Sequence, residues 1–169
     1  VIERIIINLV GIICASERRC CMKISTKAKY GVTALYELAQ HFGAGPVSLN
    51  TIAVSPDISE PYLEQLMGKL RRAGFVKSVR GAQGGYMLAT PPCDISPGSI
   101  ITALEGPIAF VDCLNPSEDM VCGKAERCGT RSVWTKVTDG INDVLDSIKL
   151  ADLCGESGCA NCRVMATEK

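Results

Sequence analysis

Ten cysteines in a chain of 169 residues are the side chains with the clearest capacity for chemistry. Cys113, Cys122 and Cys128 share one stretch rich in turn-forming residues, with the spacing C-x8-C-x5-C. Thiolates bind iron–sulfur clusters and zinc. A loop of this length can close around one centre, because the entropic cost of closure grows slowly with loop length. The spacing therefore favours one metal centre, against the alternative of three unrelated thiols.

Three further cysteines, Cys154, Cys159 and Cys162, lie near the end of the chain with the spacing C-x4-C-x2-C. This spacing is part of the plant-type ferredoxin pattern, but no fourth cysteine follows it. A second metal centre and a tail with reactive thiols are equal alternatives for this group.

A second kind of chemistry, contact with double-stranded DNA, is indicated between residues 59 and 80. Gln65 can form two hydrogen bonds with adenine, and Glu64 can accept one from cytosine. Arg80 opens a glycine-rich turn whose backbone can approach a narrow minor groove. Lys23 and Lys27, at the start of the first predicted helix, could also meet the DNA backbone. The expected DNA-binding residues are Ser59, Tyr62, Glu64, Gln65, Lys69, Arg71 and Arg80, together with Lys29 in the first helix.

Two helices joined by a turn must position these side chains. Ser48 is a suitable N-cap for a short helix that stops at the proline turn 55–57. Ser59 then caps a longer helix, with Pro61 in its first turn. The buried face of this longer helix is expected to be Leu63, Leu66, Met67 and Leu70.

A hairpin is expected directly after the second helix. Gly74 ends that helix, and strands over 75–79 and 86–89 pair across the turn 80–85. A helix-turn-helix followed by such a wing is a DNA-docking arrangement. The fold class is therefore mainly α with a small β-hairpin wing.

Further helices precede and follow this unit. Ser25 or Thr26 caps a first helix to about His41, and another helix opens at Ser96. A long C-terminal helix is expected from about Thr130 to Ile148. Its apolar stripe could finish the core or pair with a second copy, and we favour pairing as a homodimer. The stripe is Trp134, Val137, Ile141, Val144, Leu145 and Ile148.

Charge and composition divide the chain. Residues 23–90 hold eight Lys or Arg against four Asp or Glu, and residues 91–169 hold seven against twelve. We expect 22–92 to be the winged helix-turn-helix domain, 93–153 the cysteine loop and dimerisation helix, and 154–169 a cysteine-containing tail. Residues 1–21 have an apolar run too short to span a bilayer and no clear cleavage site, so we expect an upstream extension outside the fold. The expected compartment is the cytoplasm, with no membrane partner.

Four motifs together resemble the Rrf-type winged-helix transcription regulators over residues 22 to about 153. They are MKISTKAKYGVTAL from Met22, SEPYLEQL from Ser59, LRRAGFVKSVRGAQGGYML from Leu70 and ITALEGPI from Ile101. The resemblance implies a homodimeric DNA-binding regulator whose long helices cross at the dimer interface. It implies that the protein is not an enzyme. In the IscR-type branch of this family three loop cysteines, here Cys113, Cys122 and Cys128, hold a 2Fe–2S cluster that alters which DNA sites are bound.

The resemblance leaves the fourth cluster ligand open. The IscR-type branch has a histidine three residues after the last cysteine, where this chain has Arg131. A nitric-oxide-sensing branch uses an acidic residue just before the first-helix tyrosine, where this chain has Lys29. The remaining possibilities are a tail cysteine, an exogenous thiol or a loop carboxylate from Asp112, Asp119 or Glu126.

Two other functions compete with cluster sensing. The chain also resembles the CymR-type branch, which is cluster-free and is controlled by complex formation with cysteine synthase, but that branch lacks the loop cysteines. A redox enzyme or electron carrier would use the thiols directly, and the single histidine and the absence of a nucleophile–base pair in the sequence speak against it.

Overall fold

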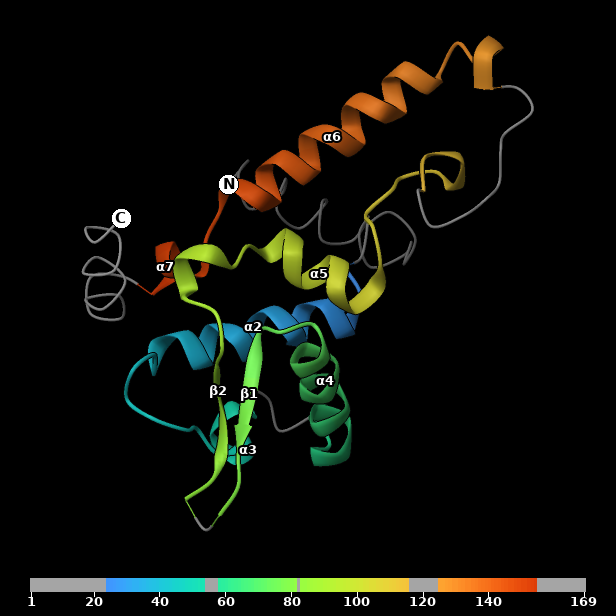
Figure 1. Ribbon diagram of the computed structural model, residues 1–169. Coiled ribbons are helices and arrows are strands. Elements are labelled where there is room, and N and C mark those ends of the chain that lie inside the picture. The colour runs from blue at the N-terminus through green and yellow to red at the C-terminus, as the bar shows by residue number, and fades with distance from the viewer. Residues whose placement is uncertain (1–23, 54–57, 82, 116–124, 155–169) are drawn as a thin grey trace, which may run out of the picture.

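The computed structural model describes residues 24–53, 58–81, 83–115 and 125–154. The elements from the blue N-terminal helix to the long helix 131–147 follow the predicted order, and a short red helix at the C-terminal end, 150–153, was not predicted (Figure 1). The predictions for residues 1–21, for the turn 55–57 and for Cys122, Cys159 and Cys162 fall outside the described residues. The main elements are α2 (Thr26–Gln40), α3 (Leu49–Ile52), α4 (Glu60–Arg72), β1 (Val76–Val79), β2 (Gly85–Leu88), α5 (Pro97–Glu105), α6 (Arg131–Ser147) and α7 (Leu150–Leu153), with 3-10 turns η1 (Pro92–Asp94), η2 (Asp112–Leu114) and η3 (Ala125–Arg127).

Serine caps set the starts of the helices. Of the two predicted caps of α2, Ser25 is the one observed, since its hydroxyl accepts a hydrogen bond from the backbone N–H of Ala28 at 3.1 Å. Ser48 caps α3 in the same way. Ser59 occupies the N-cap of α4, but its side chain makes no capping bond, contrary to the prediction. The reason is local: Pro61 has no N–H, and the N–H of Tyr62 bonds to the backbone carbonyl of Ser59 at 3.0 Å.

The core lies between α2, α4, α5 and the inner face of the hairpin. The predicted stripe of α4 is confirmed, since Leu63, Leu66, Met67 and Leu70 are all buried. Gly31 is where α2 crosses α5, and a Cβ atom there would overlap the Leu104 side chain. A glycine at this crossing therefore allows the two helices their close approach.

The wing is an antiparallel pair, β1 and β2, with the register from Val76 opposite Leu88 to Val79 opposite Gly85. β1 begins one residue later than predicted and ends where predicted, and β2 begins and ends one residue earlier than predicted. Val47, which precedes α3, exchanges two backbone hydrogen bonds with Tyr86, at 2.8 and 2.9 Å. The segment before the helix-turn-helix thus pairs with the wing and fixes its direction.

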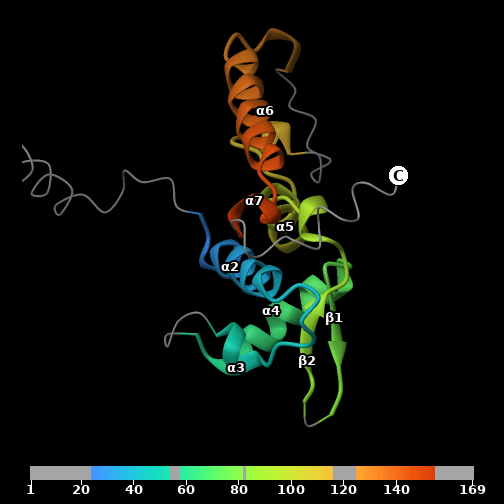
Figure 2. The same cartoon turned by 90° about the vertical axis from the view of Figure 1, so that its left-hand side faces the viewer.

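The long helix α6 rises away from α3, α4 and the hairpin in both views (Figures 1 and 2). Within α6 only Thr138 is buried, whereas α7 returns to the core through Leu150. The backbone N–H of Leu150 donates to the Ile95 carbonyl at 3.0 Å and so joins the end of the chain to the start of α5. The fold class is confirmed: a mainly helical chain with a two-stranded hairpin. In the described part of the chain, no helix has both the length and the apolar character needed to cross a bilayer.

Candidate nucleic-acid interface and cysteine loop

One face of α4 is polar and open to solvent. Tyr62, Glu64, Gln65 and Lys69 are exposed on it, directly above the buried apolar stripe. In both views α3, α4 and the hairpin occupy the end of the molecule opposite α6 (Figures 1 and 2). The helix that can enter a groove and the wing that can flank it therefore point the same way.

Two arginines follow this face. The guanidinium of Arg71 donates to the Ser78 hydroxyl at 3.2 Å, so this side chain ties α4 to β1. Arg80 follows β1 at the hairpin tip and is exposed. Gly81, beside it, has a φ of +122°, a conformation that glycine adopts at little cost. Arg80 is thus free to reach outward, whereas Arg71, also exposed, is hydrogen-bonded to β1 on the surface.

The lysines of α2 take different positions. Lys29 is exposed, whereas Lys27 borders a small hollow together with Tyr62, Gln65, Leu66 and Lys69 of α4. The Lys27 ammonium donates to the backbone carbonyl of Leu104 at the end of α5. Sequence spacing puts Lys27 and Lys29 on different sides of α2 but cannot show which side faces α4.

The cysteine loop begins and ends at described residues. Cys113 lies half-buried in η2, and Cys128 is exposed just before α6. The Cys128 sulfur lies 3.4 Å from the Thr130 hydroxyl. This hydrogen bond, followed by the backbone N–H of Thr130, lowers the pKa of the Cys128 thiol. The hydrogen bonds therefore favour the thiolate of Cys128, the form that binds metals, more than in an isolated thiol.

The described residues contain no group of three His, Cys, Asp or Glu side chains close enough to hold a metal ion. Cys122, one of the three predicted ligands, is outside the described ranges. Cys154 lies at the edge of the core, where its thiol donates to the Leu150 carbonyl at 3.2 Å. The donor chemistry of Cys113 and Cys128 fits a thiolate-bound centre, and the described residues give no complete ligand set.

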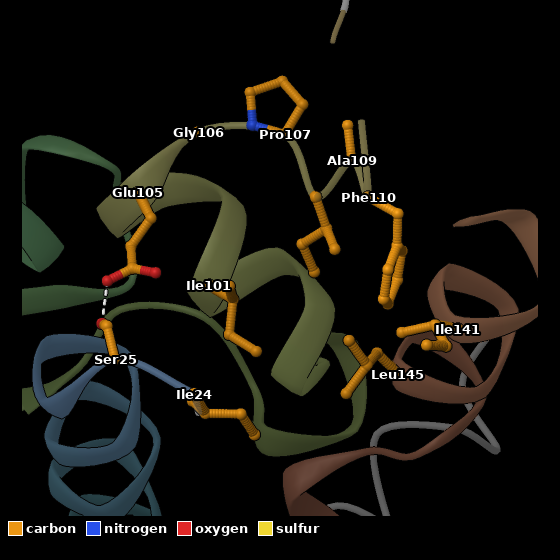
Figure 3. A pocket seen from close by; sticks show the side chains of 11 residues that line it. Ile24, Ser25, Ile101, Glu105, Gly106, Pro107, Ala109, Phe110, Ile141 and Leu145 are labelled. Atoms are coloured by element: carbon orange, nitrogen blue, oxygen red, sulfur yellow. Dashed lines mark hydrogen bonds between the residues drawn. The ribbon is translucent and has the colours of Figure 1, made fainter. Parts of the chain in front are cut away.

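An apolar pocket of about 530 Å³ lies where α5, the segment 106–110 and α6 meet. Figure 3 shows Ile101, Phe110 and Leu145 turned toward this space from three different elements. The Ser25 hydroxyl donates to the Glu105 carboxylate at its edge. The pocket thus adjoins both the start of α2 and the segment that leads to the cysteine loop.

A helix-turn-helix with an attached wing, and with a polar face exposed on its second helix, defines a winged-helix DNA-binding protein. The family model described as "Rrf2: Iron-dependent Transcriptional regulator" matches residues 24–156. The chain belongs to this family of transcription regulators, as the sequence motifs predicted.

The similar proteins represent two kinds of regulator. The HTH-type transcriptional regulator CymR of Bacillus subtilis is 48% identical over 132 residues, which are 78% of this chain and 89% of the relative. The solved structure of B. subtilis CymR, the global cysteine regulator, has a TM-score of 0.64 and 46% identity, covering 79% of this chain and 97% of that one. The structure of T. potens IscR has a TM-score of 0.62 and 54% identity, covering 78% and 85%.

Proposed function

We propose that this protein is a homodimeric transcription regulator whose binding to double-stranded DNA is governed by an iron–sulfur cluster on the loop 113–128. The observation that supports DNA binding is the face of α4, where polar and basic side chains lie exposed above a buried apolar stripe. We place the protein in the cytoplasm, where it would meet DNA.

The exposed residues would contact different parts of the DNA. Gln65 and Glu64 carry the hydrogen-bonding groups that distinguish base edges in the major groove. Lys69 and Lys29 would contact phosphates, which set affinity and position without reading sequence. Arg80 at the hairpin tip suits the negative potential of a narrow minor groove. Ser59 and Tyr62 in the first turn of α4 would contact the backbone at the groove edge.

Pairing of α6 with its copy would bring a second recognition helix to the second half-site of the DNA. Trp134, Val137, Val144 and Ile148 are all exposed on the predicted stripe. A solvent-exposed apolar stripe on a helix is typical of an interface, because burying it removes apolar area from water.

Cys113, Cys122 and Cys128 would hold the cluster, proposed as 2Fe–2S, and the bound cluster would supply an iron centre that responds to oxidants and to iron supply. Thiolate character at Cys128, favoured by Thr130, supports this role. Arg131 cannot be the fourth ligand, because a guanidinium does not lose its proton in proteins. The remaining donors are Asp112, Asp119, Glu126, a tail cysteine or an exogenous thiol.

The likeness to CymR favours a second function, a cluster-free regulator of cysteine metabolism controlled by a protein such as cysteine synthase. Both functions use the same DNA-binding surface. They differ in the signal that acts on the loop and on α6, which is a bound cluster in the first function and a partner protein in the second.

Iron and sulfide analysis with an absorption spectrum, on protein purified without oxygen, separates the two. Cluster sensing predicts visible absorbance that Cys122→Ala removes and that Cys93→Ala, outside the loop, retains. Colourless, iron-free protein that co-purifies with cysteine synthase would establish the second function instead.

DNA binding is tested separately by selecting duplexes from a randomised pool. Gln65→Ala should relax base preference at one position of each half-site, at a cost of about 1–3 kcal/mol against the preferred base. Failure of the wild-type protein to bind any duplex would overturn both functions.

A further inference from the structure

Two lysines that are far apart in sequence meet beside α4. Lys27 of α2 and Lys69 of α4 border one hollow, and Tyr62 and Gln65 border it as well. The positive charge of Lys27, and after it the close approach of the Lys27 amine, lower the pKa of Lys69. The other charged neighbour that shifts the pKa of Lys69 is also a cation, Arg72. The two lysines thus border the same hollow, and their positive charges repel each other.

The C-terminal end of α5 holds Lys27 in this position. Its ammonium donates to the backbone carbonyl of Leu104, in the last turn of α5. Carbonyls at the C-terminal end of a helix carry partial negative charge, so they favour an ammonium there. Ser25, two residues earlier, bonds to Glu105 of the same helix end. The α2–α5 contact therefore sets the direction of Lys27 before any ligand arrives.

A pair of adjacent cations is stabilised by an anion placed between them, and an oxyanion can accept hydrogen bonds from both ammonium groups. The neighbours of this pair indicate which anion. Tyr62 and Gln65 belong to the exposed face of α4 that faces DNA in the proposed function, so a phosphate at the hollow would belong to the backbone that borders the same groove.

We propose that Lys27 and Lys69 together hold one phosphate of the DNA backbone, and that this shared contact sets the register of α4 in the groove. The inference rests on the proposed DNA binding and adds to it a specific phosphate site. Lys27 contributes to it as a residue positioned by α5, and Lys69 as a residue of α4 itself.

Sharing of one phosphate has a measurable signature. Each phosphate contact that is lost lowers the slope of log K against log salt concentration by about 0.9. Lys27→Met and Lys69→Met should each weaken binding alike for all sequences, but each should lower the magnitude of the slope by much less than 1 per subunit, because the other lysine still neutralises the phosphate. Because both lysines serve one phosphate, the double variant should lose about 1 per subunit, the loss of one phosphate contact, whereas two separate phosphates would give a loss of about 2.

Fluorescence anisotropy with a short randomised duplex, over a series of salt concentrations, measures these slopes for the full-length protein. Lys136→Met is the matched control, since Lys136 is exposed on α6, away from α4. It should bind like the wild type. Circular dichroism and sedimentation identify a variant that fails to fold, and Lys69→Met provides the test if Lys27→Met does, because Lys69 is exposed.

The outcomes separate this inference from the proposed function. A double variant with an unchanged slope would overturn the phosphate site, and a loss of about 1 per subunit in each single variant with about 2 in the double variant would show two separate phosphates instead of a shared one. Wild-type protein that does not bind the duplex would overturn DNA binding itself.

Discussion

The hydroxyl of Ser96 donates a 2.8 Å hydrogen bond to the carboxylate of Asp146, which joins the N-cap of α5 to the last turns of α6. Ser96 is 4% exposed, and Gly98 leaves room for the same carboxylate above the first turn of α5. A carboxylate in this place also interacts favourably with the positive end of the helix dipole. The contact couples the long helix to the DNA-binding half.

Replacing Asp146 by alanine should therefore destabilise the fold. We expect Asp146→Ala to lower the free energy of unfolding by about 1 kcal/mol, since it removes one hydrogen bond to a charged group that is partly open to water. Urea denaturation measures the change. Asp139→Ala, an exposed residue of the same helix, is the control. Equal stability of the two variants would contradict the coupling.

Placing a side chain on Gly85 should loosen the wing. A Cβ atom there would overlap the backbone carbonyl of Val47 and would break its pairing with Tyr86. With two backbone hydrogen bonds lost, Gly85→Ala should cost about 2 kcal/mol in unfolding free energy. Gly129→Ala, where the added atom meets open space, should cost much less in the same denaturation experiment. We would abandon this role of Gly85 if both variants unfolded at one midpoint.

The reactivity of Cys128 should depend on Thr130. The hydroxyl hydrogen bond lowers the pKa of the thiol, so the thiolate forms at a lower pH than it would without that bond. In iron-free protein, Thr130→Val should move the pH midpoint of iodoacetamide alkylation at Cys128 upward, as followed by peptide mass spectrometry. Thr130→Ser keeps a hydroxyl and should retain the wild-type midpoint. Identical midpoints in the two variants would exclude the hydroxyl as the cause.

A charge on the apolar stripe of α6 should prevent dimer formation. Val137 is exposed in the single chain, and burying a glutamate there against a second copy would be strongly unfavourable. Val137→Glu should sediment as a monomer at concentrations where the wild type is a dimer. Lys136→Glu, at an exposed position of the same helix outside the apolar stripe, should remain a dimer. A dimeric Val137→Glu protein would place the interface elsewhere.

Local features of the fold were predictable because they depend on neighbouring residues. Ser25, Ser48 and Ser96 cap helices with their side chains, as serine does when the third amide of the helix is available. Ser59 does not, because Pro61 and the backbone bond of Tyr62 change which amides are available. The exposed face of α4 likewise followed from the period of its apolar residues.

Contacts between distant segments were not predictable from one sequence. Lys27 and Leu104 are joined only when α2 crosses α5, and nothing near either residue marks the other. The same holds for Ser96 and Asp146. Arg71 was expected to face DNA, and its bond to Ser78 depends on how closely β1 follows α4 in space.

The position of α6 outside the body of the protein has a consequence for the DNA that a dimer can accept. In the proposed dimer, the paired α6 helices would connect the two DNA-binding domains rigidly, because each α6 is hydrogen-bonded to its own domain through Asp146 and Ser96. No flexible linker would separate the two domains. A rigid connection fixes the angle between the two DNA-binding domains around the axis of the duplex. Inserting about five base pairs, half a helical turn, between the half-sites would move the second half-site to the opposite side of the DNA. The second DNA-binding domain of the dimer could then not reach it.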